Sequence, residues 1–107
     1  MMRVVLLVTL LSSCAPSEDE IQKEFDSFVS AHNACEQDED CVLIMPGCPL
    51  GCWTAVNVDA AGEATRLARE LIEDYESAGR ACAYGCVASC GARCSDKACV
   101  RIEACTF

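Results

Sequence analysis

The sequence predicts a small disulfide-rich α+β domain, with two helices at about residues 18–33 and 58–77 packed on a small antiparallel sheet that includes about 41–45 and 98–104. Three observations favour this fold class. Eleven of the 107 residues are cysteine, a density typical of small exported domains in which cross-links replace core burial. Two long stretches carry apolar residues at helical spacing, and shorter apolar, β-branched stretches lie between turn signals.

Length and charge limit the function classes. A chain of 107 residues has a marginal core, and each disulfide typically adds about 2 to 4 kcal/mol by restricting the unfolded chain. The net charge of -9 repels phosphate backbones, and no basic stripe with aromatics offsets it, so no nucleic-acid partner is predicted. The same charge disfavours docking on anionic lipid, so any membrane association requires a covalent anchor.

The first 13 residues have the features of an export signal. Arg3 is followed by an apolar run at residues 4–11 that is too short to span a bilayer. We therefore predict a lipoprotein signal peptide at 1–13, a lipid anchor and short linker at 14–17, and a single cysteine-rich domain at 18–107.

The sequence LSSC at residues 11–14 resembles the lipobox of bacterial lipoproteins. The resemblance implies that Cys14 is lipidated and becomes the first residue, which anchors the protein in the bacterial cell envelope. Ala15 after the anchor resembles the pattern of lipoproteins sorted to the outer membrane, facing the periplasm or the cell surface. The alternative is a secretory signal cut after Ala15, but Pro16 would then follow the scissile bond, which such cleavage disfavours.

Cysteine parity supports the same assignment. Without Cys14, ten cysteines remain, an even set that closes five bridges without a spare thiol in an oxidising envelope. Their spacing does not select one pairing. The predicted disulfide cysteines are Cys35, Cys41, Cys48, Cys52, Cys82, Cys86, Cys90, Cys94, Cys99 and Cys105.

The first helix is predicted from a capping signal and an apolar stripe. Ser17 and Glu20 have capping-box spacing, with acids in the first turn where the helix dipole favours them. The stripe is formed by Ile21, Phe25, Phe28 and Val29. His32, the only histidine, is expected near the helix end, where the dipole favours a cation, and no metal or catalytic role is assigned to it.

Two short strands are predicted in the middle of the chain. The acidic turn at 36–40 lacks the spacing of a calcium loop and leads into the apolar strand 41–45. The loop at 48–52 is shaped by proline and glycine between two cysteines, and Leu50 is expected to be exposed at its tip. Residues 52–56 favour a second strand; the alternative is a helix that begins at Pro49.

The longest helix follows, with Asn57 or Asp59 as its cap and Gly79 at its end. Its apolar stripe comprises Ala60, Ala64, Leu67, Ala68, Leu71, Ile72 and Tyr75. Trp53 and Tyr75 are interpreted as core aromatics rather than as ligand-stacking residues.

The last quarter of the chain concentrates cysteines at four-residue intervals from Cys82 to Cys94. Gly85 and Gly91 interrupt any helix there, so we expect loop and extended structure that is cross-linked to neighbouring elements. Residues 95–97 form a predicted turn, and the final strand is expected to pair with 41–45, which brings Cys99 near the first cysteines.

Residues 35–105 resemble small cysteine-rich domains of exported bacterial lipoproteins, described as eight-cysteine clusters. The resemblance rests on the opening cysteine-valine strand, the loop GCPLGC at 47–52, the residues AVN at 55–57 before a helix, and the closing turn and strand. It supports the fold and implies no activity.

The predicted function is an envelope-anchored, non-catalytic binding or structural lipoprotein with an unknown envelope protein or ligand as partner. No nucleophile–base signature surrounds His32, so neither an enzyme nor catalytic residues are predicted. No cofactor or metal is predicted, because zinc-ribbon, thioredoxin-like and haem spacings are absent from the sequence. Two alternatives remain: Cu(I) or soft-metal sequestration by residues 82–94, which resemble helical copper-storage proteins, and a protease-inhibitor-like module that presents Leu50.

Overall fold

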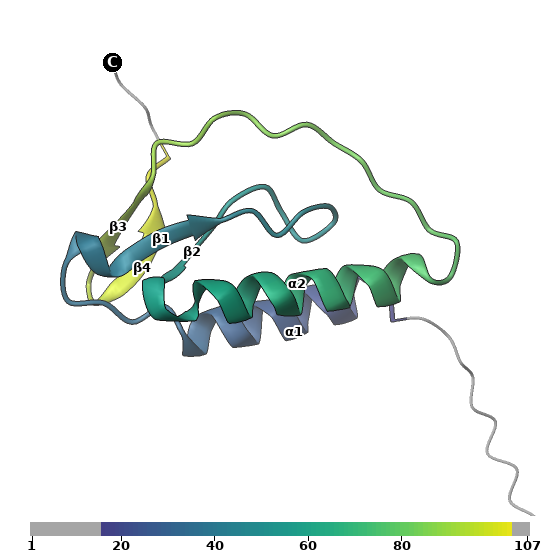
Figure 1. Cartoon of the computed structure of the whole chain (residues 1–107), viewed down its shortest axis with the longest axis horizontal. Helices are drawn as coiled ribbons and strands as arrows, with labels where there is room; N and C mark the ends of the chain where they lie inside the picture. The colour runs from purple at the N-terminus through teal and green to yellow at the C-terminus, as the bar shows by residue number, and fades with distance from the viewer. Residues whose placement is uncertain (1–15, 104–107) are drawn as a thin grey trace, which may run out of the picture.

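The computed structural model describes residues 16–103 and combines two helices with four short strands (Figure 1). The elements are α1 (Glu18–Ala31), β1 (Cys41–Ile44), β2 (Thr54–Asn57), α2 (Ala61–Glu76), β3 (Ala92–Ser95) and β4 (Ala98–Arg101), with short 3₁₀ helices at Asp38–Asp40 and Val58–Ala60. Four cysteine pairs are joined by disulfides. The predicted class, a small disulfide-rich α+β fold, is confirmed.

Helix α1 begins with the predicted capping box. The Ser17 hydroxyl accepts a hydrogen bond from the Glu20 amide at 3.1 Å, and the Glu20 carboxylate accepts one from the Ser17 amide at 2.7 Å. This reciprocal pair satisfies amides that a helix start leaves without partners. The helix ends at Ala31, two residues before the predicted end, and buries Ile21 and Phe25.

Helix α2 lies beside α1 and runs in the opposite direction (Figure 1). The Asn57 side chain accepts a hydrogen bond from the Asp59 amide, which caps the 3₁₀ turn that precedes α2. Gly79 adopts a φ of 83° and donates its amide to the Glu76 carbonyl, as expected of a glycine that terminates a helix. The predicted end of this helix is therefore confirmed, whereas Asn57 caps the 3₁₀ turn and α2 itself begins three residues after the predicted start, without a side-chain cap.

The strands form two separate two-stranded antiparallel sheets, β1 with β2 and β3 with β4. The expected pairing of 98–104 with 41–45 is wrong, as is the alternative helix from Pro49. Strand β4 pairs with β3, a strand that was not predicted, across a two-residue turn in which Asp96 and Lys97 have φ values of 51° and 64°. Two positive φ angles define the tight hairpin turn whose twist matches antiparallel strands, so the local pairing forms at low entropic cost.

The chain that follows α1 connects the two sheets. The Asn33 carbonyl accepts the Cys99 amide at 2.7 Å, and the Lys97 carbonyl accepts the Cys35 amide at 3.1 Å. On the other side, the His32 carbonyl accepts the Asn57 amide at 2.9 Å. Residues 32–35 therefore lie between the end of β2 and the start of β4.

Two clusters of buried residues result, which we call the apolar core and the sulfur core. The apolar core lies between the helices, β1, β2 and the loop that joins these strands, and it contains Ile21, Phe25, Ile44, Leu50, Val56, Ala64, Ala68 and Leu71. The sulfur core contains buried Cys35, Ala55 and Cys99, with Cys41, Leu43, Ala92 and Cys94 packed against them.

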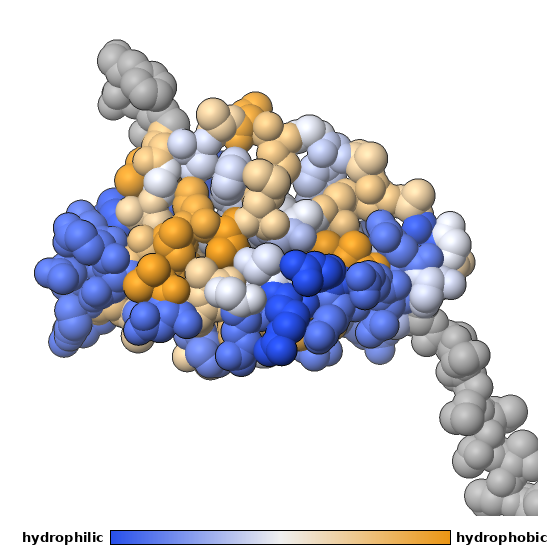
Figure 2. Space-filling model, in the orientation of Figure 1, coloured by the Kyte–Doolittle hydropathy of each residue, from blue (hydrophilic) through white to orange (hydrophobic). Residues whose placement is uncertain are grey.

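Residues 78–91, which we call the strap, connect α2 to β3 without a helix or strand of their own (Figure 1). The strap leaves the far end of α2 and arches back over the molecule to the sheets. Figure 2 shows hydrophilic residues along the exposed faces of the helices and apolar residues between the helices and the strap.

Candidate functional site

The structure places eight of the predicted cysteines in four disulfides: Cys35–Cys94, Cys41–Cys99, Cys48–Cys82 and Cys52–Cys86. Their Cα–Cα distances lie between 5.4 and 5.9 Å, the usual range for a disulfide. Cys90 is also disulfide-bonded. Cys14 and Cys105 lie outside the described residues.

Two of these bridges attach the strap to the loop between β1 and β2. Cys48–Cys82 and Cys52–Cys86 have the same sequence separation, 34 residues, so the loop and the strap run parallel in register. The Trp53 indole adds a hydrogen bond of 2.8 Å from Nε1 to the Val87 carbonyl. The four-residue spacing of these cysteines therefore serves links to a neighbouring segment, which confirms that part of the prediction.

Leu50 does not lie at an exposed tip. Its exposed fraction is 6% and it belongs to the apolar core. The loop folds inward because the Gly47 carbonyl accepts the amides of Leu50 and Gly51, at 2.7 and 3.0 Å. The expectation of an exposed Leu50 is wrong, and this leucine is not available for insertion into a protease.

The two remaining bridges form the sulfur core at the other end of β1. The sulfur atoms of Cys35, Cys41 and Cys99 lie within 4.8 Å of one another, and Cys35 and Cys99 are only 5% and 4% exposed. Cys94 is the cross-strand partner of Cys99. The prediction that Cys99 lies near the first cysteines is confirmed.

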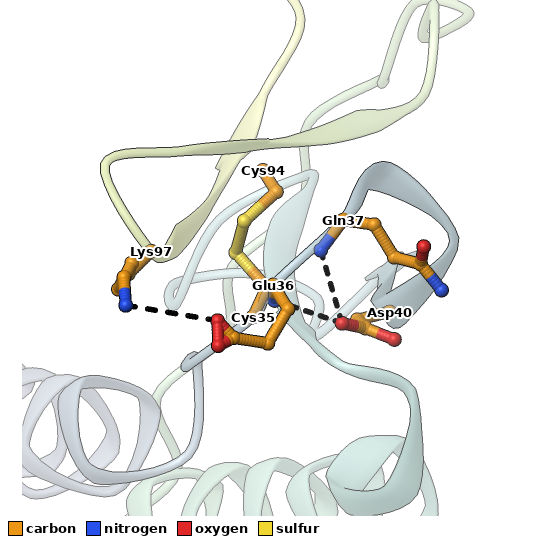
Figure 3. A network of polar contacts seen from close by, with 6 residues as sticks. All are labelled: Cys35, Glu36, Gln37, Asp40, Cys94 and Lys97. Atoms are coloured by element: carbon orange, nitrogen blue, oxygen red, sulfur yellow. Dashed lines mark hydrogen bonds and ion pairs between the residues drawn. A yellow bond between two sulfur atoms is a disulfide. The ribbon is translucent and has the colours of Figure 1, made fainter.

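The acidic turn in front of the sulfur core holds backbone amides (Figure 3). One carboxylate oxygen of Asp40 accepts the amides of Glu36 and Gln37 at 2.8 and 3.1 Å. Asp38 accepts the Cys94 amide at 2.9 Å, and Lys97 lies 3.8 Å from the Glu36 carboxylate. The Asp40 carboxylate thus stabilises the turn internally, and the Asp38 carboxylate connects the turn to β3.

His32 lies at the end of α1, as predicted. Its Nδ1 donates to the Phe28 carbonyl at 2.8 Å, since a carbonyl only accepts, and its ring stacks on Phe28 with centroids 4.0 Å apart. A groove of about 290 Å³ is lined by His32, Asp59 and Glu63 among others. Within residues 16–103, the ligand atoms of these three side chains do not converge as a metal site requires.

One carboxyl group shows a shifted pKa. The pKa of Glu20 lies below its ordinary value because its carboxylate accepts hydrogen bonds from the amide and the hydroxyl of Ser17. This group caps α1 at the surface, so the shift reflects helix capping rather than an active site.

The cysteines within residues 82–94 form disulfide bridges. Cys82, Cys86 and Cys94 are each bonded to a cysteine that precedes the strap. Cu(I) binds thiolates, and a sulfur in a disulfide is not one. The arrangement therefore gives no support to metal sequestration by residues 82–94.

Sequence reasoning placed Cys99 near the first cysteines but missed the hairpin that brings Cys94 to the same site, although a signal for this hairpin was present. Cys94 and Cys99 stand symmetrically about the turn Asp96–Lys97. A two-residue hairpin turn places such residues opposite one another on adjacent strands. Cys35 and Cys41 both lie beside Cys94 and Cys99 of this hairpin. That placement depends on the path of residues 32–35, which the sequence does not indicate.

No known protein family, no curated protein and no solved structure matches this chain. The resemblances to the lipobox and to eight-cysteine clusters therefore stay predictions that rest on the motifs quoted above. Within residues 16–103, no helix has both the length and the apolar character needed to cross a membrane.

Proposed function

We propose that this chain is a lipoprotein of the bacterial envelope, anchored through Cys14, whose disulfide-bonded domain has a non-catalytic binding or structural role at the membrane surface. The proposal depends on how many of the cysteines are disulfide-bonded. All nine cysteines in residues 16–103 are disulfide-bonded, and eleven is an odd number. The cysteine left over is therefore Cys14 or Cys105, and only Cys14 stands in a lipobox-like sequence.

A short, fixed connection would hold the domain close to the membrane. Helix α1 begins at Glu18, only four residues after Cys14. Arg80 donates to the Pro16 carbonyl at 2.5 Å, and its guanidinium lies 5.0 Å from the Tyr75 ring centroid. Arg80 therefore fixes the start of the domain against the end of α2.

This connection orients the domain. The start of α1 and the end of α2 lie at one end of the molecule, and the two sheets lie at the other (Figure 1). With a lipid on Cys14, the helix ends face the membrane, while the sulfur core and the turn at residues 95–98 face away from it. A rigid, cross-linked surface at that position suits recognition of an envelope partner, because less conformational entropy is lost on binding.

Acylation is tested by replacing Cys14. We expect the wild-type protein to sediment with membranes and to carry the mass of an acylated amino-terminal cysteine, and the Cys14→Ser variant to lose both properties. Ser12→Ala, which keeps a small residue before Cys14, is the matched control and should remain in the membrane fraction. An unacylated amino terminus in the wild-type protein would refute the anchor.

Partner binding is tested separately with the anchored protein. Pull-down from detergent-solubilised envelopes should recover the same envelope protein with the wild-type domain and with Arg80→Lys, and should lose it when the turn Asp96–Lys97 is replaced by Asn-Gly, which preserves the hairpin. Recovery that is unaffected by the turn exchange would place the partner elsewhere on the domain.

A further inference from the structure

The sulfur core brings two disulfides within reach of one another. The Cys35 sulfur lies within 4.8 Å of both sulfurs of the Cys41–Cys99 bridge. Thiol–disulfide exchange requires a thiolate to approach a disulfide sulfur, and its rate depends on access. A change of side-chain rotamer at Cys35 is sufficient to close a gap of this size.

We propose that the two bridges act as one exchange unit, in which opening of Cys35–Cys94 by a dithiol leads Cys35 to attack Cys41–Cys99. Access sets the order of events. Cys94 is half-buried on strand β3, whereas Cys35 is only 5% exposed. An incoming thiolate therefore reaches Cys94, and Cys35 becomes the leaving group beside the second bridge.

The steps balance as two substitutions followed by an internal exchange. One thiolate of the dithiol bonds to the Cys94 sulfur, and the bond from Cys94 to Cys35 breaks. The second thiol of the reagent then displaces Cys94, which leaves as a thiol, so the reagent is oxidised to its disulfide and the bridge is reduced by two electrons. The Cys35 thiolate next bonds to one sulfur of Cys41–Cys99, and the other sulfur leaves as a thiolate, which takes up the proton that the first thiol of the reagent lost when it became a thiolate.

The exchange changes how the β3–β4 hairpin is attached. In the native pairing, both bridges join this hairpin to residues 35–41. A new Cys35–Cys41 bridge lies entirely outside the hairpin and leaves thiols on Cys94 and Cys99, which are opposite one another across the strands. A new Cys35–Cys99 bridge keeps one covalent link between the hairpin and residues 35–41. Reduction of one bridge thus controls the link made by the other.

The strap bridges provide a control within the same molecule. Within residues 16–103, no other three cysteine sulfurs lie within 4.8 Å of one another as those of Cys35, Cys41 and Cys99 do. Among the described residues, a thiolate released at Cys48 or Cys82 therefore lacks a bridge in comparable contact, and we expect it to stay where it forms.

The test is limited reduction of the full-length oxidised protein with dithiothreitol, followed by acid quenching, alkylation and peptide mapping. We expect Cys35–Cys41 or Cys35–Cys99 cross-linked peptides to appear as the native Cys41–Cys99 peptide is lost. Molecules opened at Cys48–Cys82 should retain Cys52–Cys86. Alkylation confined to Cys35 and Cys94, with Cys41–Cys99 intact, would overturn the proposal.

A pair of variants gives a second measurement. Cys94→Ser leaves Cys35 without its partner, and we expect the free thiol to be distributed among Cys35, Cys41 and Cys99. Cys82→Ser is the matched control, in which the thiol should remain on Cys48. A thiol found only on Cys35 contradicts the exchange. If Cys94→Ser fails to fold, the limited reduction of the wild-type protein decides the question alone.

Discussion

The apolar core and the sulfur core are stabilised by different forces. Three large side chains of the apolar core, Ile21, Phe25 and Val56, are at most 1% exposed, and each buried apolar side chain of this kind contributes about 1.5 to 3 kcal/mol. The sulfur core contains no aromatic side chain, and its buried members are two cysteines and an alanine that are 4 to 7% exposed. The apolar core thus depends mainly on burial, with two bridges at its loop, whereas the sulfur core depends mainly on covalent links.

The difference follows from what each segment offers for burial. Helices α1 and α2 present continuous apolar stripes, whereas the β3–β4 hairpin has two four-residue strands, ARCS and ACVR. An isolated two-stranded hairpin is marginal in water. The bridges from Cys94 and Cys99 join residues 59 and 58 positions apart, and either bridge alone lowers the entropy of the unfolded chain by an amount equivalent to about 4 kcal/mol.

Full reduction of the disulfides has the largest expected effect, because it tests whether apolar burial alone can maintain the fold. We expect the reduced domain to lose its near-UV circular dichroism and its dispersed amide signals, because the bridges together rival the roughly 5 to 15 kcal/mol of net stability of an ordinary domain. Reoxidation should restore both signals, which controls for irreversible damage. A reduced domain that stays rigidly ordered would show that burial alone maintains the fold.

Phe25→Ala tests the contribution of the apolar core. Phe25 is 1% exposed within the apolar core, so its truncation should cost about 3 to 5 kcal/mol of unfolding free energy, measured by denaturant titration of the oxidised protein. Phe28→Ala, on the same helix but only half-buried, is the matched control and should cost less. Equal losses would mean that the apolar core is not centred on Phe25.

The elements that depend on local signals were predictable from the sequence. The Ser17 cap, the stripe from Ile21 to Phe25 and the glycine at residue 79 each act through neighbours within one or two helical turns. The same holds for the turn at Asp96–Lys97. These parts agree with the structure because short-range chemistry determines them.

The elements that depend on long-range packing were not predictable in the same way. Strand β3 (ARCS) has no β-branched residue, so it is a strand because the turn and the Cys94 and Cys99 bridges place it beside β4. Leu50 is buried because its loop folds onto the helices, and no pattern within residues 48–52 indicates that direction. The disulfide pairing depends on both of these features.

Asp40→Ala tests how much the polar turn adds to the sulfur core. Two amides lose their charged acceptor, so we expect a loss of about 1 to 2 kcal/mol, discounted for solvent exposure. Faster hydrogen exchange should be confined to the amides of Glu36 and Gln37. Glu39→Ala, an exposed neighbour in the same turn, is the control. A similar loss in the control would indicate a general charge effect of this turn instead.

Ser17→Ala is expected to have the smallest effect on stability, and it affects α1, which contributes to the apolar core. Loss of this N-cap should lower the unfolding free energy by about 1 kcal/mol and should return the pKa of Glu20 toward its ordinary value near 4.5. Because the folded-state pKa of Glu20 is lowered, its contribution is present above the ordinary value and is lost as the pH falls through the folded-state pKa. The difference in stability between wild type and variant should therefore shrink on acidification below about pH 4.5, the ordinary value of this carboxyl group. A difference that stays constant down to pH 2 would show that the Ser17 hydroxyl stabilises the helix start independently of the Glu20 carboxylate, whose hydrogen bond from the backbone amide of residue 17 is retained in the variant.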